Sequence, residues 1–241
     1  MLKTEHADGL ATLTLARPDR GNALSADLVE ALLAAVTTAL ADDEVHTLVL
    51  RAEGPHFCTG LDLSDLAECS DGDLLWRLVR IETLLTAVWQ CPKRTVAVAQ
   101  GRSWGAGADL FAACELRVAL PGTTMRFPGA QFGIVLGTRR LALRVGSTAA
   151  RTLITSGGEL NAQAALAVGL ATHEQAPELH APKVDARTAA ALRAATWAAE
   201  GGDQRDADMA ALVRSASLPG LKARVQRYVA ALKGTAGARP S

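Results

Sequence analysis

The sequence predicts an α/β fold with a helical region at its C-terminal end. Up to about residue 175, short apolar segments of strand length alternate with longer segments whose apolar residues recur every three or four positions. Beyond Asp185 the strand-like segments stop, and alanine-rich helical segments follow to about Lys233. Such alternation is typical of a sheet covered by helices. We therefore expect a core over residues 1–180 and a helical region over 181–241.

Four segments of the core have the composition of strands. Threonine alternates with apolar residues from Leu10 to Leu15, as in a strand with one buried face. The segment 95–100 is almost continuously apolar, which is typical of a strand buried on both faces. Two further short apolar segments, 47–50 and 116–120, are also predicted strands.

Helices are predicted between these strands. The first begins after Ser25, a residue type that caps helices, and ends at Asp42. The second spans 74–90, and a short third helix spans 108–113. In the C-terminal region, Gly201-Gly202 and Pro219-Gly220 are expected to break the helices, and residues 234–241 are expected to be frayed.

Composition excludes several classes of protein. Lys plus Arg and Asp plus Glu each number 25, so no basic excess favours DNA or an acidic membrane as partner. Aromatic residues make up 4%, too few for a surface that stacks nucleobases. No signal segment or membrane-spanning run is visible, and we expect a cytoplasmic protein. Zinc spacing is absent, and we expect free thiols and no metal at Cys58, Cys69, Cys91 and Cys114.

Two glycine-containing turns are the candidate chemical features. One is FCTGLDL at 57–63, and the other is GRSWGAG at 101–107, where Gly105 opens a helix. Glycine lets backbone N–H groups approach a ligand, and a helix N-terminus adds positive partial charge. Two such groups aimed at one point would form an oxyanion hole, although either turn alone is more often merely a tight turn.

The order of four motifs gives the two turns a context. ARPDRGNALS (16–25), FCTGLDL (57–63), WGAGADL (104–110) and FPGAQFGIVLG (127–137) follow one another at intervals that resemble the enoyl-CoA hydratase/isomerase family, also called the crotonase superfamily. The resemblance covers about residues 8–175, and the C-terminal helices more loosely.

The resemblance implies a fold, a substrate and a site. The fold would be a crotonase-like spiral of ββα units, with a C-terminal helical region that forms a homo-trimer or a hexamer. The substrate would be an acyl-thioester of coenzyme A, with no permanently bound cofactor and no metal. The amides of Leu61 and Ala106 would hold the thioester carbonyl oxygen. Coenzyme A would run along Leu61, Asp62, Leu63 and Ser64 and past Gly105 and Ala106, and a neighbouring subunit could offer Lys222, Arg224, Arg227 or Lys233 to its phosphates.

Two positions depart from the family pattern. Hydratases of this family use two glutamates, one of which corresponds to Asp109 and the other to Gly129. Losing a general acid or base typically costs about 10²- to 10⁴-fold in rate. Hydration by the usual pair is therefore in doubt, whereas Asp109 alone could serve isomerase-type chemistry. Its alternative role is a carboxylate that stabilises the first turn of a helix.

Other readings stay open. Substitute proton-moving or water-orienting groups are His56, Asp65, Glu68, Gln131 and Arg139, each of which is more often a surface residue. Trp104 is expected to shape the acyl site or to fill the core. The serious competitor is a non-catalytic acyl-CoA binding protein. GRSWG also matches the nucleophile elbow of serine hydrolases, with Ser103 as nucleophile and His173 or His180 as base. A dinucleotide-binding fold is disfavoured because the first predicted strand leads into RPDRGNA.

Overall fold

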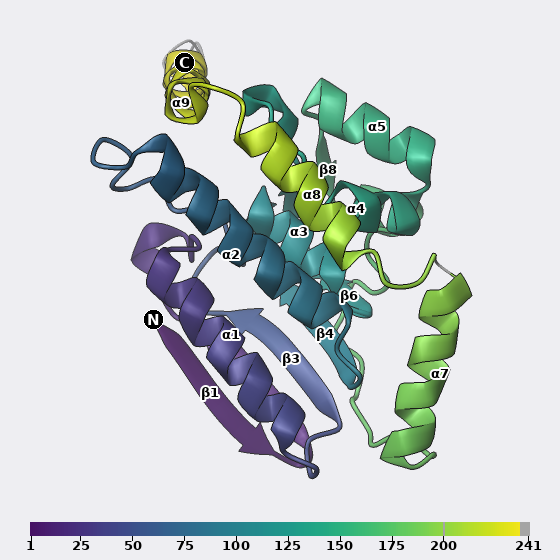
Figure 1. The fold of residues 1–241 in the computed structure, drawn as a ribbon. Helices are drawn as coiled ribbons and strands as arrows, with labels where there is room; N and C mark the ends of the chain where they lie inside the picture. Colours follow the sequence, from purple (N-terminus) through teal and green to yellow (C-terminus); the bar gives the residue numbers. More distant parts are fainter. Residues whose placement is uncertain (200, 237–241) are drawn as a thin grey trace.

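The computed structural model describes residues 1–199 and 201–236, which form two sheets surrounded by helices (Figure 1). The larger sheet has the strand order β1-β2-β3-β4-β6. β1 and β2 are antiparallel, and the other neighbours are parallel. The bounds are β1 Leu2–Ala7, β2 Leu10–Leu15, β3 Thr47–Ala52, β4 Arg94–Ala99 and β6 Leu116–Ala119. The predicted α/β class is confirmed.

A second, smaller sheet has the order β5-β7-β8. Its strands are β5 Arg102–Trp104, β7 Thr124–Arg126 and β8 Glu159–Asn161. This sheet is not among the elements predicted from the sequence, because each strand has only three residues and β5 coincides with a predicted glycine turn. The strand β1 was also missed, since its residues are mostly polar and exposed.

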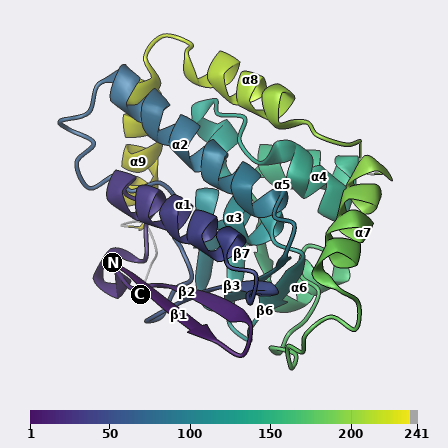
Figure 2. The same ribbon diagram turned by 60° about the horizontal axis from the view of Figure 1, so that its bottom comes forward.

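Helices cover the sheets, and α1 and α2 lie side by side in both ribbon views (Figures 1 and 2). Helices α4 to α6 follow the second glycine turn and α3. Two short 3₁₀ helices are η1 Pro18–Arg20 and η2 Pro128–Phe132. The α-helices are α1 Ala26–Ala41, α2 Asp71–Trp89, α3 Ala106–Ala113, α4 Thr138–Val145, α5 Ser147–Ser156, α6 Ala162–Ala167, α7 Ala186–Ala199, α8 Arg205–Ala216 and α9 Leu221–Ala236.

Capping residues set the helix starts. The Ser25 side chain accepts from Leu28 N at 3.3 Å, which confirms the predicted start of α1. Helix α2 begins three residues before its predicted start at Leu74. Ser70 Oγ accepts from Asp73 N at 3.1 Å, and the Asp73 carboxylate accepts from Ser70 N at 2.8 Å. This reciprocal cap extends α2 beyond its apolar face.

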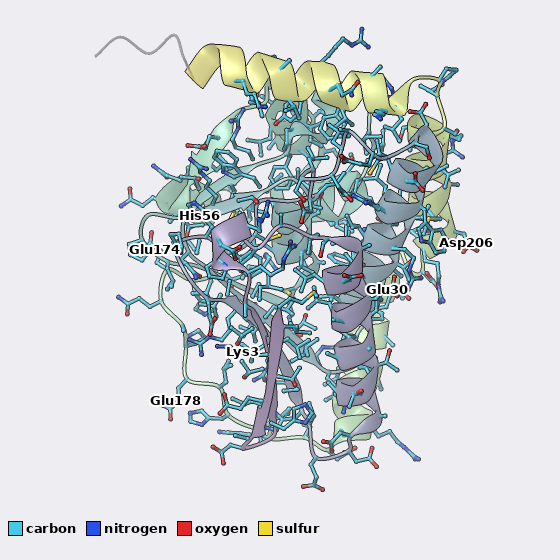
Figure 3. All side chains as sticks on the ribbon, turned by 90° about the vertical axis from the view of Figure 1, so that its left-hand side faces the viewer. Lys3, Glu30, His56, Glu174, Glu178 and Asp206 are labelled. Carbon is cyan, nitrogen blue, oxygen red and sulfur yellow. The ribbon has the colours of Figure 1, made fainter. Side chains whose placement is uncertain are left out.

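The C-terminal helices α8 and α9 pack on the core through a second apolar cluster. Leu74 and Leu78 of α2 contact Leu212 of α8 and Val225 of α9. The Asp71 carboxylate accepts hydrogen bonds from the backbone amides at the start of α9, and the one from Lys222 N measures 2.7 Å. Helix α9 thereby lies across one end of the molecule (Figure 3).

The predicted helix breaks at 201–202 and 219–220 are confirmed. Residues 234–236 belong to α9 and are not frayed as expected, whereas 237–241 lie outside the described residues. The predicted division of the chain at residue 180 remains a prediction.

Candidate active site

The two glycine turns lie against each other. Trp104 N donates to Cys58 O at 2.9 Å, and Cys58 N donates to Arg102 O at 3.2 Å. Gly60 has a φ of +95°, and a methyl group on it would lie 2.9 Å from Trp104 O and 3.4 Å from Ala106 N. A side chain at Gly60 would push the two turns apart, which is why glycine suits this position.

Within the part of the chain that the structure describes, the backbone amides of Leu61 and Ala106 donate no hydrogen bond. Ala106 is the first residue of α3, where helix geometry leaves the N–H unpaired. Leu61 forms a parallel bridge with Leu24. Leu24 N donates to Gly60 O at 2.8 Å, and Leu24 O accepts from Asp62 N at 3.1 Å. This pattern turns the Leu61 amide away from Leu24. Leu61 and Ala106 line the same cavity.

The cavity beside these residues is mostly apolar. Its wall comes from residues 59–61 and 63, Leu78 of α2, Trp104, Gly105 and the start of α3, the segment 127–136, α4, α5 and one face of α9. Among the described residues, Asp109 is the only carboxylic acid that lines it, and no Lys, Arg or His does so. An apolar cavity with few polar groups is typical of a small-molecule site. Its apolar side chains include Leu63, Phe127, Ile134, Leu136, Ile154 and Val229.

Asp109 lies on the first turn of α3 and is 6% exposed. Its Oδ1 abuts Gly137, the residue before α4, on which an added methyl group would lie 2.1 Å from that oxygen. Burial raises the pKa of the Asp109 carboxyl well above its usual value, Arg140 lowers this pKa, and Glu82 raises it. The carboxyl therefore keeps its proton to a higher pH than an exposed aspartate does.

A buried ion pair lies between α2 and α4. Arg140 donates to both carboxylate oxygens of Glu82, at 2.6 and 3.1 Å, and both residues are 1% exposed. Arg140 also donates to Thr86 Oγ1 at 2.9 Å. This pair is not among the site residues predicted from the sequence, although Glu82 is a charged residue beside Ile81 on the apolar face of α2.

The ion pair extends to α8. Asp208 Oδ2 accepts from Arg139 at 2.7 Å and lies 3.4 Å from Arg140. The Arg140 Nε is buried and has no hydrogen-bond partner. The four charged side chains, two arginines and two carboxylates, join α2, α4 and α8 next to the cavity.

Leu61 and Leu63 line the cavity, whereas Asp62 and Ser64 do not. The Asp62 carboxylate pairs with Arg17 at 2.9 Å and accepts from Ser64 N at 3.0 Å. Burial would raise the pKa of Asp62, but these hydrogen bonds and the Arg17 charge lower it overall. Asp62 therefore fastens the loop, and coenzyme A contact with residues 61–64 remains a prediction.

Gly129 lines the cavity as the second residue of η2. Glycine has no side chain, so this part of the wall carries no proton-transfer group, and a methyl group on Gly129 would lie 3.3 Å from Ile134 O. Trp104 and Gly105 line the cavity as well. The Trp104 ring lies between Arg102 and Arg126, whose guanidinium carbons are 4.7 and 5.2 Å from the ring centre.

The substitute groups considered from the sequence lie outside the cavity wall. The residues that are absent from the cavity wall are His56, Asp65, Glu68, Gln131 and Arg139. His56 Nδ1 accepts from Arg102 N at 3.2 Å, and Asp65 pairs with Arg77. None of the five is therefore placed to transfer a proton in the cavity.

The four basic residues of α9 differ in their contacts. Lys222 donates to Ala67 O at 2.6 Å, and Arg224 donates to Phe132 O at 2.9 Å. These two side chains fasten α9 within its own chain. Arg227 and Lys233 are exposed. A role of any of the four toward phosphates remains a prediction.

Ser103 is poorly placed for hydrolase chemistry. It is fully buried, and its Oγ donates to Gly107 O at 3.3 Å. His173 Nδ1 instead lies 2.8 Å from Thr172 Oγ1, and His180 is exposed. Neither histidine contacts the serine, which disfavours the hydrolase.

The comparison with known families decides the classification. The sequence model of the enoyl-CoA hydratase/isomerase family matches residues 5–229. The chain belongs to the enoyl-CoA hydratase/isomerase family. This member is 34% identical over 206 residues to a Mycobacterium leprae protein named as an enoyl-CoA hydratase, covering 83% of this chain and 76% of that protein. It is 32% identical to the human mitochondrial methylglutaconyl-CoA hydratase over 70% of this chain and 51% of that protein.

Solved structures agree with this family assignment. A Bordetella parapertussis structure titled as an enoyl-CoA hydratase/isomerase superposes with a TM-score of 0.84 at 39% identity, covering 99% of both chains. A Bacillus halodurans enoyl-CoA hydratase superposes with a TM-score of 0.79 at 23% identity, covering 94% of this chain and 99% of that one, and shows the shared fold. The crotonase fold of this family member is thereby shown.

The described residues of this family member contain no candidate membrane helix and no candidate metal cluster. No described helix has the length and apolarity that a membrane span requires. No group of three or more His, Cys, Asp or Glu side chains gathers there as a metal site would need.

Proposed function

We propose that this family member binds an enoyl-CoA with the thioester carbonyl oxygen at the amides of Leu61 and Ala106, and that Asp109 moves protons on the acyl chain. Two unpaired amides beside one apolar cavity support the proposal. Each donor of an oxyanion hole is worth roughly 3 kcal/mol, because negative charge grows on the oxygen in the transition state.

The reaction that fits one carboxyl group is double-bond isomerisation. Asp109, as its carboxylate, takes a proton from C2 of a 3-enoyl thioester, and the electron pair delocalises onto the thioester oxygen as a dienolate. The same group then returns the proton to C4, and the double bond becomes conjugated between C2 and C3. One base serves both transfers, so no second carboxyl group at Gly129 is needed.

One observation carries this proposal: among the described residues that line the cavity, Asp109 is the only carboxylic acid. The second candidate, a non-catalytic acyl-CoA binder, is favoured by the bare Gly129 position. The same cavity and the same two amides would serve it.

The two functions are separated by one experiment. The chain is incubated with 3-enoyl-CoA and 2-enoyl-CoA of equal length, with conjugation followed by absorbance and binding by calorimetry. We expect conjugation of the 3-enoyl ester, slow loss of conjugation of the 2-enoyl ester, and a loss of about 10²-fold or more in isomerase turnover in Asp109→Asn with binding retained. Binding of both esters without turnover would select the binder.

A further inference from the structure

The charges next to the cavity balance without Asp109. Arg139 and Arg140 supply two positive charges, and Glu82 and Asp208 supply two negative charges. Asp109 is a third carboxyl group without a cation of its own. A buried charge is stable only when it is paired, so an isolated buried carboxyl group favours its neutral form.

Glu82 binds the positively charged guanidinium of Arg140. Its two oxygens take the donors of the guanidinium at 2.6 and 3.1 Å, and Thr86 Oγ1 donates to Glu82 Oε1 at 3.0 Å. Because Arg140 is held this way by α2, its ion pair is with Glu82 and not with Asp109. The partnerless Arg140 Nε shows that the guanidinium retains donor capacity for another acceptor.

We propose that Glu82 is a positioning residue for Asp109: by holding Arg140, it withholds that positive charge from Asp109 and leaves the Asp109 carboxyl as a neutral acid at rest. The inference rests on the proposed function, in which Asp109 reacts as a carboxylate. Glu82 then sets the fraction of molecules that carry the base.

Two of the neighbouring elements contribute charges to this balance. Helix α3, which carries Asp109 on its first turn, contacts α2, α4, β4 and β5, and α9 lines the same cavity. The burial of Asp109 and the opposing effects of Arg140 and Glu82 on its pKa agree with the charge count. Among the charged or titratable side chains on these elements, Arg140 of α4 and Glu82 of α2 act on the Asp109 carboxyl, Asp208 of α8 links Arg139 to Arg140, and Tyr228 of α9 lines the cavity.

The test is a direct titration of the Asp109 carboxyl carbon by ¹³C NMR in the full chain, without substrate. Wild type is expected to titrate Asp109 well above the ordinary value of 3.8. Glu82→Gln is expected to move the midpoint to lower pH by about one unit or more, because it removes a negative charge and frees Arg140. The matched control is Thr86→Val, which removes a hydrogen bond of the same network without removing charge and should leave the midpoint unchanged.

The results separate the inference from the proposed function. A wild-type Asp109 midpoint at or below the ordinary 3.8, or an equal midpoint in Glu82→Gln, would overturn the role of Glu82 even where Asp109 supports turnover. A shifted midpoint in a chain that binds esters without turnover would support Glu82 and reject the isomerase. Where turnover occurs, the acidic limb of its pH profile should shift with the NMR midpoint, because Asp109 reacts as a carboxylate. Should Glu82→Gln not fold, Asp208→Asn is expected to shift the midpoint in the same direction by less, because Asp208 lies 3.4 Å from Arg140.

Discussion

The carboxyl group of Asp109 lies against the backbone of Gly137, where a methyl group would come within 2.1 Å of Oδ1. This contact joins the start of α3 to the start of α4. Gly137 thus fixes the place of the one carboxylic acid among the described lining residues. The first prediction follows from it.

Gly137→Ala is expected to displace Asp109 and lower isomerase kcat/KM by about 10²-fold, the effect of a misplacement of roughly 1 Å. Alanine is also strained at the Gly137 φ of +65°. Gly202→Ala is the control, because Gly202 has a φ of +69° with nothing within 4 Å. Equal losses in both variants would show that backbone strain, and not the contact, is responsible.

Gly129→Glu is expected to add a second carboxyl group to the cavity and to raise hydration of 2-enoyl-CoA by about tenfold or more. The new Cβ would meet Ile134 O at 3.3 Å, which requires a small adjustment of the wall. Gly129→Gln, of similar size but unable to transfer a proton, should not gain activity. A similar gain in both variants would assign the effect to cavity shape.

Asp109 is expected to make stability fall as pH rises. Its pKa is raised in the native state, so the native chain keeps a proton that the unfolded chain loses above the ordinary pKa of 3.8. Between these two pKa values the free energy of unfolding declines by up to about 1.4 kcal/mol per pH unit. Asp109→Asn lacks this decline. Denaturation curves should therefore show that the free energy of unfolding of Asp109→Asn, relative to that of wild type, increases with pH in that window.

The control for this stability measurement is Asp19→Asn, which removes a carboxylate whose side chain is 78% exposed. Its stability relative to wild type should not follow that pH dependence. An Asp109→Asn advantage that is constant across pH would contradict a neutral buried carboxyl group.

The cavity is expected to select uncharged acyl chains. No basic side chain lines it in the described structure, so a terminal carboxylate would be buried without a partner. Calorimetry should show an acyl-CoA ending in a methyl group binding about 10²-fold or more tightly than one of equal length ending in a carboxylate. A chain ending in a hydroxyl should fall between them, and equal affinities for all three would refute this selectivity.

Much of the fold could be predicted because its signals are local. Ser25 and the apolar face of α2 indicate helices without reference to distant residues, and the apolar segment 95–100 indicates a buried strand. Strand β5 could not be predicted in this way, because three residues carry little pattern and their pairing partner in β7 begins at Thr124.

The candidate site was predicted only in part for a similar reason. The two turns and Asp109 are recognisable as motifs, and the cavity brings Leu61, Ala106 and Asp109 together. The Glu82–Arg140 pair joins residues 58 positions apart, and each looks like an ordinary helix residue in the sequence. Only folding shows that both are buried beside Asp109.

A crystal structure of the chain with an unreactive acyl-CoA would most directly test the account. The account predicts the thioester oxygen about 2.7–3.2 Å from the amide nitrogens of both Leu61 and Ala106, with the acyl chain in the cavity beside Asp109. A thioester oxygen that contacts neither amide, with the acyl chain outside the cavity, would contradict it.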